Sequence, residues 1–332
     1  MTAALTWARL SYRQQRWELI LAAIGVGIVA AVMLFFANEL RGLQAAGPDC
    51  VGLFDYPPSC EAIATRFAET SDTAQRLLLL SFAAPFGMGV ILGAPLVARE
   101  IEGGTVQLAW TLGRSRVGWL LRRITFVALV TVALLAVLAL SSELLAAALA
   151  PDRSLGEDFL WSGRRGWLIV ARGVGALGVG ILVGAVVGRV LPAILGAALI
   201  MALGFTAISM GQDAVLRNEV EPQRVAMGNA SGGVDPGALV IDFGLELPGG
   251  EVVTWQEAQE RGLIAAVIDE EGRQFASAAD MRAGRVLGYD IQLTIPGSQY
   301  LPVAAREAGV VTGLGLVALV GTALVVSRRR PA

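Results

Sequence analysis

The 332-residue sequence contains no lysine and no histidine, and each absence excludes a class of site. Without lysine, the chain cannot contain a phosphate-binding loop that ends in Gly-Lys-Ser/Thr, so it has no ATPase of this type. Without histidine, it lacks the commonest general base, the commonest metal ligand and the usual proton-relay side chain. No paired carboxylates or nucleophile–base arrangement stands out either. We therefore expect no enzyme, no metal site and no cofactor in this chain.

Charge is also scarce, since only 16% of the residues are charged and 55% are hydrophobic. Soluble domains carry about a quarter charged residues. The deficit is concentrated in uncharged runs at 19–37, 77–98, 124–142, 173–188, 190–212 and 308–327. Because a bilayer is crossed by about 20 apolar residues in a helix, these runs predict an all-α polytopic protein with six spans. We expect the lipid bilayer, and no nucleic acid, as its surroundings.

The spans divide the chain into predicted regions. Residues 17–212 hold spans one to five, and 304–332 hold the sixth span and an Arg tail. The stretch 173–212 is about twice as long as one span and must turn back at "GRVLP", which contains Arg189 and Pro192.

Arginine is denser in 1–17, 99–123, the Arg189 turn and the tail than in the alternate loops. The positive-inside rule therefore places both termini in the cytoplasm. The exclusive use of arginine suggests a GC-rich bacterium, hence a bacterial cytoplasmic membrane. Residues 1–16 mix apolar and Arg side chains and predict a helix at the membrane surface.

The outer loops contain two further features. Cys50 and Cys60, in loop 38–76, are the only cysteines, and outside the cytoplasm they can remain oxidised. We favour a structural disulfide over a redox or metal site, because no other ligand pattern accompanies them. Residues 213–303 predict a small extracytoplasmic α+β cap, with strands in "ALVIDFGLEL", "EVVTW" and "GYDIQLTI". The acidic excess of this cap fits a solvated surface better than a site for a cationic substrate.

Small residues recur at four-residue spacing in the fourth and sixth spans and predict close helix packing, within one chain or between two copies. They are Ala176, Gly180, Gly184, Gly188, Gly309 and Gly313. Ionisable residues within the spans are few: Glu143 should reach an interface, and Arg172 and Arg189 should extend to the membrane surface. The absence of acids from the middle of the membrane disfavours a proton- or sodium-coupled secondary transporter.

The polar stretch "REIEGGTVQLAWTLGRSRVGWLLRR" at 99–123 lies between the second and third spans. Gly103 and Gly104 should end one helix, while Thr105 and Ser115 can cap the next two. A short apolar helix with a charged rim is typical of a docking surface. An interfacial loop anchored by Trp110 and Trp119 is the alternative.

This loop resembles the first cytoplasmic loop of type-2 ABC transporter permeases, especially actinobacterial ones. The shared pattern falls at Arg99, Glu100, Glu102, Gly104, Thr105, Leu108, Thr111, Ser115, Arg116 and Trp119. The six spans, the Gly-rich fourth span, the large outer loop before the sixth span and the "RRR" tail are also similar.

The resemblance implies an exporter subunit that forms the translocation path with a second permease copy. Two copies of a separate ABC ATPase would bind ATP and Mg²⁺, and the surface helix at 1–16 would be the connecting helix. Coupling would involve Arg99, Glu100, Glu102, Gly103, Gly104, Thr105, Leu108, Trp110, Arg114, Ser115, Arg116 and Trp119. A membrane sensor or scaffold with a ligand-binding cap is the other alternative.

Overall fold

The computed structural model describes residues 2–51, 57–104, 115–225, 235–263, 265 and 267–328, with side chains from residue 15. The chain forms two compact units. The helical unit comprises Met1–Asp152, Trp161–Thr206 and Ala304–Ala332, and the sheet unit comprises Arg153–Leu160 and Ala207–Val303.

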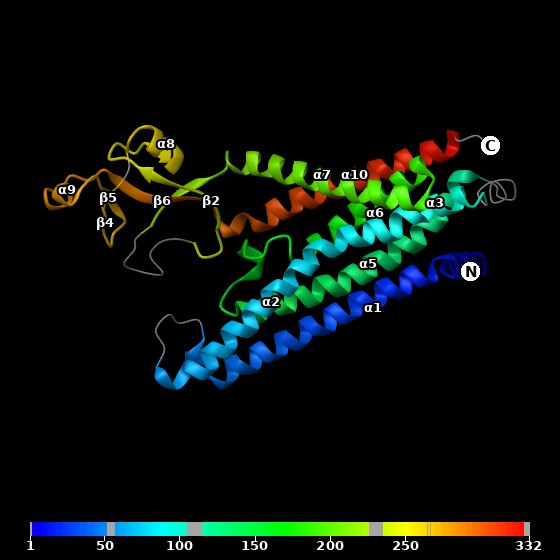
Figure 1. Ribbon diagram of the computed structural model, residues 1–332, viewed down its shortest axis with the longest axis horizontal. Helices are drawn as coiled ribbons and strands as arrows, with labels where there is room; N and C mark the ends of the chain where they lie inside the picture. The colour runs from blue at the N-terminus through cyan, green and yellow to red at the C-terminus, as the bar shows by residue number, and fades with distance from the viewer. Residues whose placement is uncertain are drawn as a thin grey trace. The chain divides into compact units, whose positions relative to one another are not determined.

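Six helical stretches are long and apolar enough to cross a membrane, which confirms the number predicted from the uncharged runs. The helices of these stretches are α1 (Thr2–Ala46), α2 (Glu61–Met88), α3 (Ala94–Glu102), α5 (Arg116–Leu149), α6 (Leu168–Val187), α7 (Val190–Leu216) and α10 (Tyr300–Arg328). Helices α2 and α3 belong to one stretch, Pro58–Glu102, interrupted by a π-helical segment at Gly89–Gly93. Figure 1 shows α1 running alongside α5, with α6 behind α2 and α5.

Helix α1 is not continuous in its geometry. Gln15 has non-helical backbone angles, with φ −120° and ψ 16°, and divides the helix into a short first part and a long second part. The break lies next to residue 16, where the surface helix was predicted to end. The position of the first part at a membrane surface stays a prediction.

The connection between α1 and α2 contains a disulfide between Cys50 and Cys60, as predicted. Two 3₁₀ turns, Pro48–Cys50 and Pro58–Cys60, carry the two cysteines. In both turns a proline occupies an early position, where its missing N–H costs nothing.

Replacing both cysteines with serine should lower the free energy of unfolding by about 3 kcal/mol, because the bond closes a short loop in the unfolded chain. The measurement is denaturant unfolding of the chain in detergent, with and without a reductant. The reductant should destabilise the wild type and leave the double variant unchanged. Equal free energies of unfolding of the wild type and the double variant, both measured without reductant, would contradict the prediction.

The sheet unit contains a six-stranded antiparallel sheet in the order β3-β2-β6-β5-β4, with β1 also paired to β6. The strands are β1 (Glu221–Arg224), β2 (Leu239–Glu246), β3 (Val252–Thr254), β4 (Val267–Ile268), β5 (Arg273–Phe275) and β6 (Gly288–Ile295). In register, Phe243 lies opposite Gln292 and Gly244 opposite Ile291, with a bulge between Val240 and Asp242. Two short helices, α8 (Trp255–Glu260) and α9 (Ala278–Arg282), complete the unit. The three predicted strands correspond to β2, β3 and β6.

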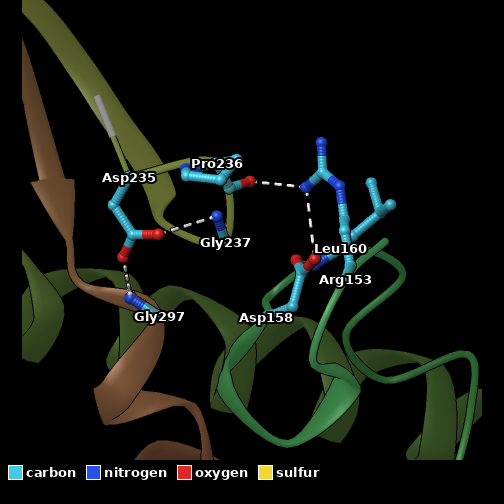
Figure 2. A network of polar contacts seen from close by, with 7 residues as sticks. All are labelled: Arg153, Asp158, Leu160, Asp235, Pro236, Gly237 and Gly297. Atoms are coloured by element: carbon cyan, nitrogen blue, oxygen red, sulfur yellow. Dashed lines mark hydrogen bonds and ion pairs between the residues drawn. The ribbon is translucent and has the colours of Figure 1, made fainter. Parts of the chain in front are cut away.

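The segment Arg153–Leu160 follows α5 in the chain but belongs to the sheet unit, because polar contacts fasten it to the start of β2 (Figure 2). Arg153 donates to the Asp158 carboxylate at 3.1 Å and to the carbonyl of Pro236. The same carboxylate accepts from the backbone N–H of Leu160 at 2.6 Å.

A second carboxylate, that of Asp235, holds together the two ends of the central strand pair (Figure 2). It accepts from the N–H of Gly237, before β2, at 2.9 Å and from the N–H of Gly297, after β6, at 2.7 Å. These bonds satisfy backbone donors that the ladder leaves unpaired.

Candidate functional site

The end of α3 carries three charged side chains that contact three different helices. Gly103 and Gly104 end α3, and Gly104 has a left-handed φ of 66° that favours glycine. Just before this end, Arg99 pairs with Glu18 of α1. We call the charged groups at this end of the bundle the tether cluster: Glu18, Arg99, Glu100, Glu102, Arg116 and Arg123.

Glu100 of the tether cluster is buried. Its carboxylate lies 2.9 Å from the guanidinium of Arg123 of α5, and the two residues are only 7% and 6% exposed. The Arg123 guanidinium also lies 5.6 Å from the ring centre of the buried Trp119. Because breaking a buried pair leaves an uncompensated charge, this contact fixes α3 to α5.

Glu102 contacts the beginning of α7. Its carboxylate accepts from the backbone N–H of Val190, the first residue of α7, at 2.8 Å. The first N–H groups of a helix lack partners within the helix, and its N-terminus attracts negative charge. Glu102 therefore caps α7 from another helix, directly after the turn at Arg189.

The start of α5 is also fastened. Ser115 is the N-cap, and its hydroxyl accepts from the N–H of Gly118 at 3.0 Å, as its predicted capping role requires. Arg116 donates to the carbonyl of Ser327, near the end of α10, at 3.2 Å. Figure 1 shows the start of α1 and the end of α10 at the same end of the bundle as α3.

The structure places the predicted coupling residues unequally. Residues 105–114, which include Thr105, Leu108, Trp110 and Arg114, lie outside the described residues. The prediction that Glu100 belongs to an exposed charged rim needs correction, because Arg123 draws its side chain inward. Trp119 is likewise a buried residue of the bundle and does not lie at its surface. Arg99 and Glu102 are exposed.

The predicted small-residue face of α6 packs against the same chain. A Cβ added to Gly180 would lie 2.3 Å from the carbonyl oxygen of Gly89, and one added to Gly184 would lie 2.1 Å from that of Ala94. Ala176 touches Gly89 in the same row. Backbones approach this closely only where no side chain separates them.

The other predicted packing glycines behave differently. Gly188 caps the end of α6 with φ 67°. Among the described residues, a Cβ added to Gly309 or Gly313 of α10 would meet no atom within 4 Å, so these two glycines do not pack within one chain. Their packing against a second copy, the other predicted arrangement, stays a prediction. Gly315, on another face of α10, contacts Gly175 instead. Spacing alone cannot distinguish which face of a glycine-rich helix turns inward.

A second buried ion pair, absent from the sequence predictions, joins α6 to α10. Arg172 donates to Glu307 at 2.7 Å and to the carbonyl of Gly163 at 2.6 Å. Its guanidinium also lies 5.1 Å and 5.3 Å from the ring centres of Phe82 and Phe205. The expectation that Arg172 extends to the membrane surface is therefore wrong, because its partners surround it inside the bundle.

Glu307 was missed because the uncharged run begins one residue later, at 308, whereas α10 begins at Tyr300. The sequence could have indicated Glu307, because the apolar residues of "YLPVAAREAG" continue the helical pattern of the sixth span toward its N-terminal side. A third ion pair joins Glu143 of α5 to Arg165 at 3.0 Å, and Arg165 is 2% exposed. Glu143 thus lies near the end of its helix, with a partner.

In the sheet unit, most described ion pairs neutralise carboxylates locally. They are Glu246–Arg224, Glu251–Arg261, Glu257–Arg261, Asp269–Arg273, Glu271–Arg273 and Asp280–Arg285. The hydrogen bond from Arg224 lowers the pKa of Glu246, and burial raises the pKa of Asp290. This pairing favours the interpretation of the acidic cap as a solvated surface. Among the described residues, no group of three or more Cys, Asp or Glu could hold a metal ion.

A comparison with protein families identifies the architecture around these sites. The family described as ABC-2 membrane transporter related matches residues 23–211, more than half of the chain. The chain belongs to this family. Searches of curated proteins and of solved structures returned no match.

Membership makes this ABC-2-related protein a multi-pass membrane protein and a component of membrane transport rather than a catalytic enzyme. ABC-2 permeases generally pair with an ATPase subunit. The matched residues include α2, α3, α5 and α6 and most of α7. They also include five of the six residues of the tether cluster: Arg99, Glu100, Glu102, Arg116 and Arg123.

Proposed function

We propose that this ABC-2-related protein is the permease subunit of an ATP-driven exporter in a bacterial cytoplasmic membrane. Two copies form the translocation path, and each receives movement from a separate ATPase through residues 99–123. Both termini and this loop face the cytoplasm, and the cap at 213–303 lies on the opposite side. ATP and Mg²⁺ belong to the partner, because this chain has no lysine for a Walker-type loop.

The tether cluster is the observation that carries this proposal. Residues 105–114 connect α3 to α5, and charged contacts fasten both ends of that connection to other helices. Arg99 holds α1, Glu102 holds α7, and Arg116 holds α10. Since Glu100 also joins α3 directly to α5, a displacement of the connection would move five helices together. Packed helices joined by ion pairs and hydrogen bonds can carry energetic coupling between distant sites when they have two alternative arrangements.

The exposed side of α7 supports assembly with a second copy. Leu191, Leu195, Leu199 and Leu203 recur every four residues and are 60–67% exposed, so they form one apolar face. Only 17% of the most apolar part of α7 is buried within the chain, the lowest share among the six spans. A second copy can cover such a face by van der Waals packing in the membrane.

The proposal predicts that Glu102→Ala uncouples the permease without removing the ATPase. The chain is expressed with a candidate ABC ATPase from the same genome, and the purified complex is reconstituted in nanodiscs with one spin label at Gly42→Cys. This position on α1 is exposed and has no atom within 4 Å of an added Cβ. In a dimer, the label reports a distance between two copies, and ATP with vanadate should change it. Glu102→Ala should reduce that change, because α7 loses its cap, while the ATPase still co-purifies.

Glu69→Ala is the matched control, because Glu69 is an exposed glutamate on α2 of the same unit. It should leave the distance change intact. Absence of a co-purifying ATPase, or of any distance between two labels, would contradict the proposed function. An unchanged response in Glu102→Ala would contradict the coupling role of the tether cluster.

A further inference from the structure

The long stretch from α2 to α3 changes its helical geometry at one place, Gly89–Gly93, which we call the π segment. A π-helical turn is wider than an α-helical turn and occurs mostly as a single bulge, often at functional positions. The π segment separates α2 from the nine residues of α3. Arg99, Glu100 and Glu102 of the tether cluster all lie on this short α3 arm.

The sequence explains why the geometry changes here. Pro95 has no N–H, so the carbonyl of Ile91 cannot receive its usual α-helical hydrogen bond. Pro85 removes another donor one turn before the π segment. Gly89 and Gly93 add backbone freedom at both ends of the segment, and kinks concentrate at proline and glycine. This part of the stretch is therefore the easiest place to bend.

The π segment lies directly on the backbone of α6. A Cβ added to Gly180 would lie 2.3 Å from the carbonyl oxygen of Gly89, and a Cβ added to Gly93 would lie 2.9 Å from the carbonyl oxygen of Leu177. In this contact, no side chain at Gly89, Gly93 or Gly180 interlocks with the opposite helix. Apart from the methyl group of Ala176, which contacts Gly89, the two backbones meet directly, so the helices can rotate against each other with little change of side-chain rotamers.

Two apolar cavities flank the π segment on its other sides. One, of about 510 Å³, lies between α1 and α2, and the other, of about 470 Å³, lies between α2 and α7. Both are lined by Ala83, Gly87 and Ile91. A well-packed interior would resist movement of this segment. Here the two cavities are open to the surroundings, so side chains of this chain do not pack tightly against the segment on the faces turned away from α6.

We propose that the π segment is the hinge of the permease, about which the α3 arm swings when the ATPase displaces residues 105–114. The proposal rests on the proposed function and adds the place where the movement is converted. In this movement α6 stays in place and supports the π segment, because it is the most buried span, with 67% of its most apolar part covered by the rest of the chain. The tether cluster then carries the swing of α3 to the ends of α1, α5 and α7. Hinges of this kind are a few residues that absorb a change in backbone angles.

Deleting Ile91 tests this hinge. A π bulge contains one residue more than the α-helical turn it replaces, so the deletion should convert it to α-helix and keep both flanks in phase. Arg99, Glu100 and Glu102 should retain their partners, and the ATPase should still co-purify. The spin label at Gly42→Cys should lose its ATP-dependent distance change, because the stretch no longer bends.

Glycine substitutions provide a second, independent test. Gly180→Ala places a methyl group against the carbonyl of Gly89 and should reduce the distance change. Gly87→Ala is the matched control on α2, since an added Cβ there meets no atom within 4 Å, and it should have no effect. If deletion of Ile91 prevents folding, the comparison of Gly180→Ala with Gly87→Ala still tests the hinge. A full distance change in the Ile91 deletion, or equal responses of the two alanine variants, would overturn the hinge. Failure of the wild type to bind the ATPase or to respond to ATP would instead remove the proposed function.

Discussion

Glu100→Leu is expected to lower the free energy of unfolding by about 3–5 kcal/mol, the loss that follows removal of one partner from a buried ion pair. The variant leaves the Arg123 guanidinium in an environment that excludes water. Arg123 already has a buried Nε without a hydrogen-bond partner among the described residues, so it has little to compensate the lost carboxylate. Chemical unfolding of the purified chain in detergent, followed by circular dichroism, measures the change.

The double variant Glu100→Leu/Arg123→Leu separates the lost charge pair from lost packing. It should be much more stable than the single variant, because two apolar groups can replace a buried pair with little loss. Asp72→Leu is the control for an exposed pair, since Asp72 and Arg76 are largely exposed and should contribute less than about 1 kcal/mol. Equal destabilisation by Glu100→Leu and Asp72→Leu would contradict the burial argument.

Glu307→Leu is the second substitution with a large expected effect, about 3 kcal/mol of unfolding free energy, at the lower end for a buried pair. Arg172 loses its carboxylate but keeps the carbonyl of Gly163 and the faces of Phe82 and Phe205. A cation over aromatic faces is stabilised by about 2 kcal/mol or more when water is excluded. The same unfolding measurement should therefore rank Glu307→Leu below Glu100→Leu.

Phe205→Leu tests whether the aromatic rings around Arg172 contribute to the free energy of unfolding. Alone, it should have a modest effect, because Glu307 still neutralises Arg172. Combined with Glu307→Leu, it should lower the stability by more than the sum of the two single effects, since residues that share a partner do not act additively. Strict additivity would show that the rings do not stabilise the guanidinium.

The sequence predicted the six spans because long uncharged runs have few alternative structures. It also predicted the cap strands β2 and β3 and the long β6, whose β-branched and apolar residues are bounded by turns. It did not predict β1, β4 and β5, which have two to four residues. β1 and β5 pair with β6, and β4 pairs with β5. Such short strands have little local preference, and tertiary contacts decide them.

The tether cluster was predicted only in part. The pattern of Arg99, Glu100 and Glu102 identified the segment, but the direction of each side chain depends on which helices surround α3. Glu100 turns inward only because Arg123 lies beside it, 23 residues later in the chain. Likewise, Gly309 and Gly313 match the spacing of a packing face, whereas the rotation of α10 directs Gly315 to α6.

The pair formed by Arg172 and Glu307 has a consequence for how the protein is made. Its two members are separated by 135 residues, and the larger segment of the sheet unit, Ala207–Val303, is synthesised between them. α6 therefore leaves the ribosome with an unneutralised guanidinium, and Gly175 and Gly178 lack their contacts with α10 until that helix is made. Since an unpaired charge in the bilayer is costly, a chain truncated before α10 should remain recognisable to membrane proteases as unfinished. We therefore expect completion of the last helix to protect the chain from such degradation.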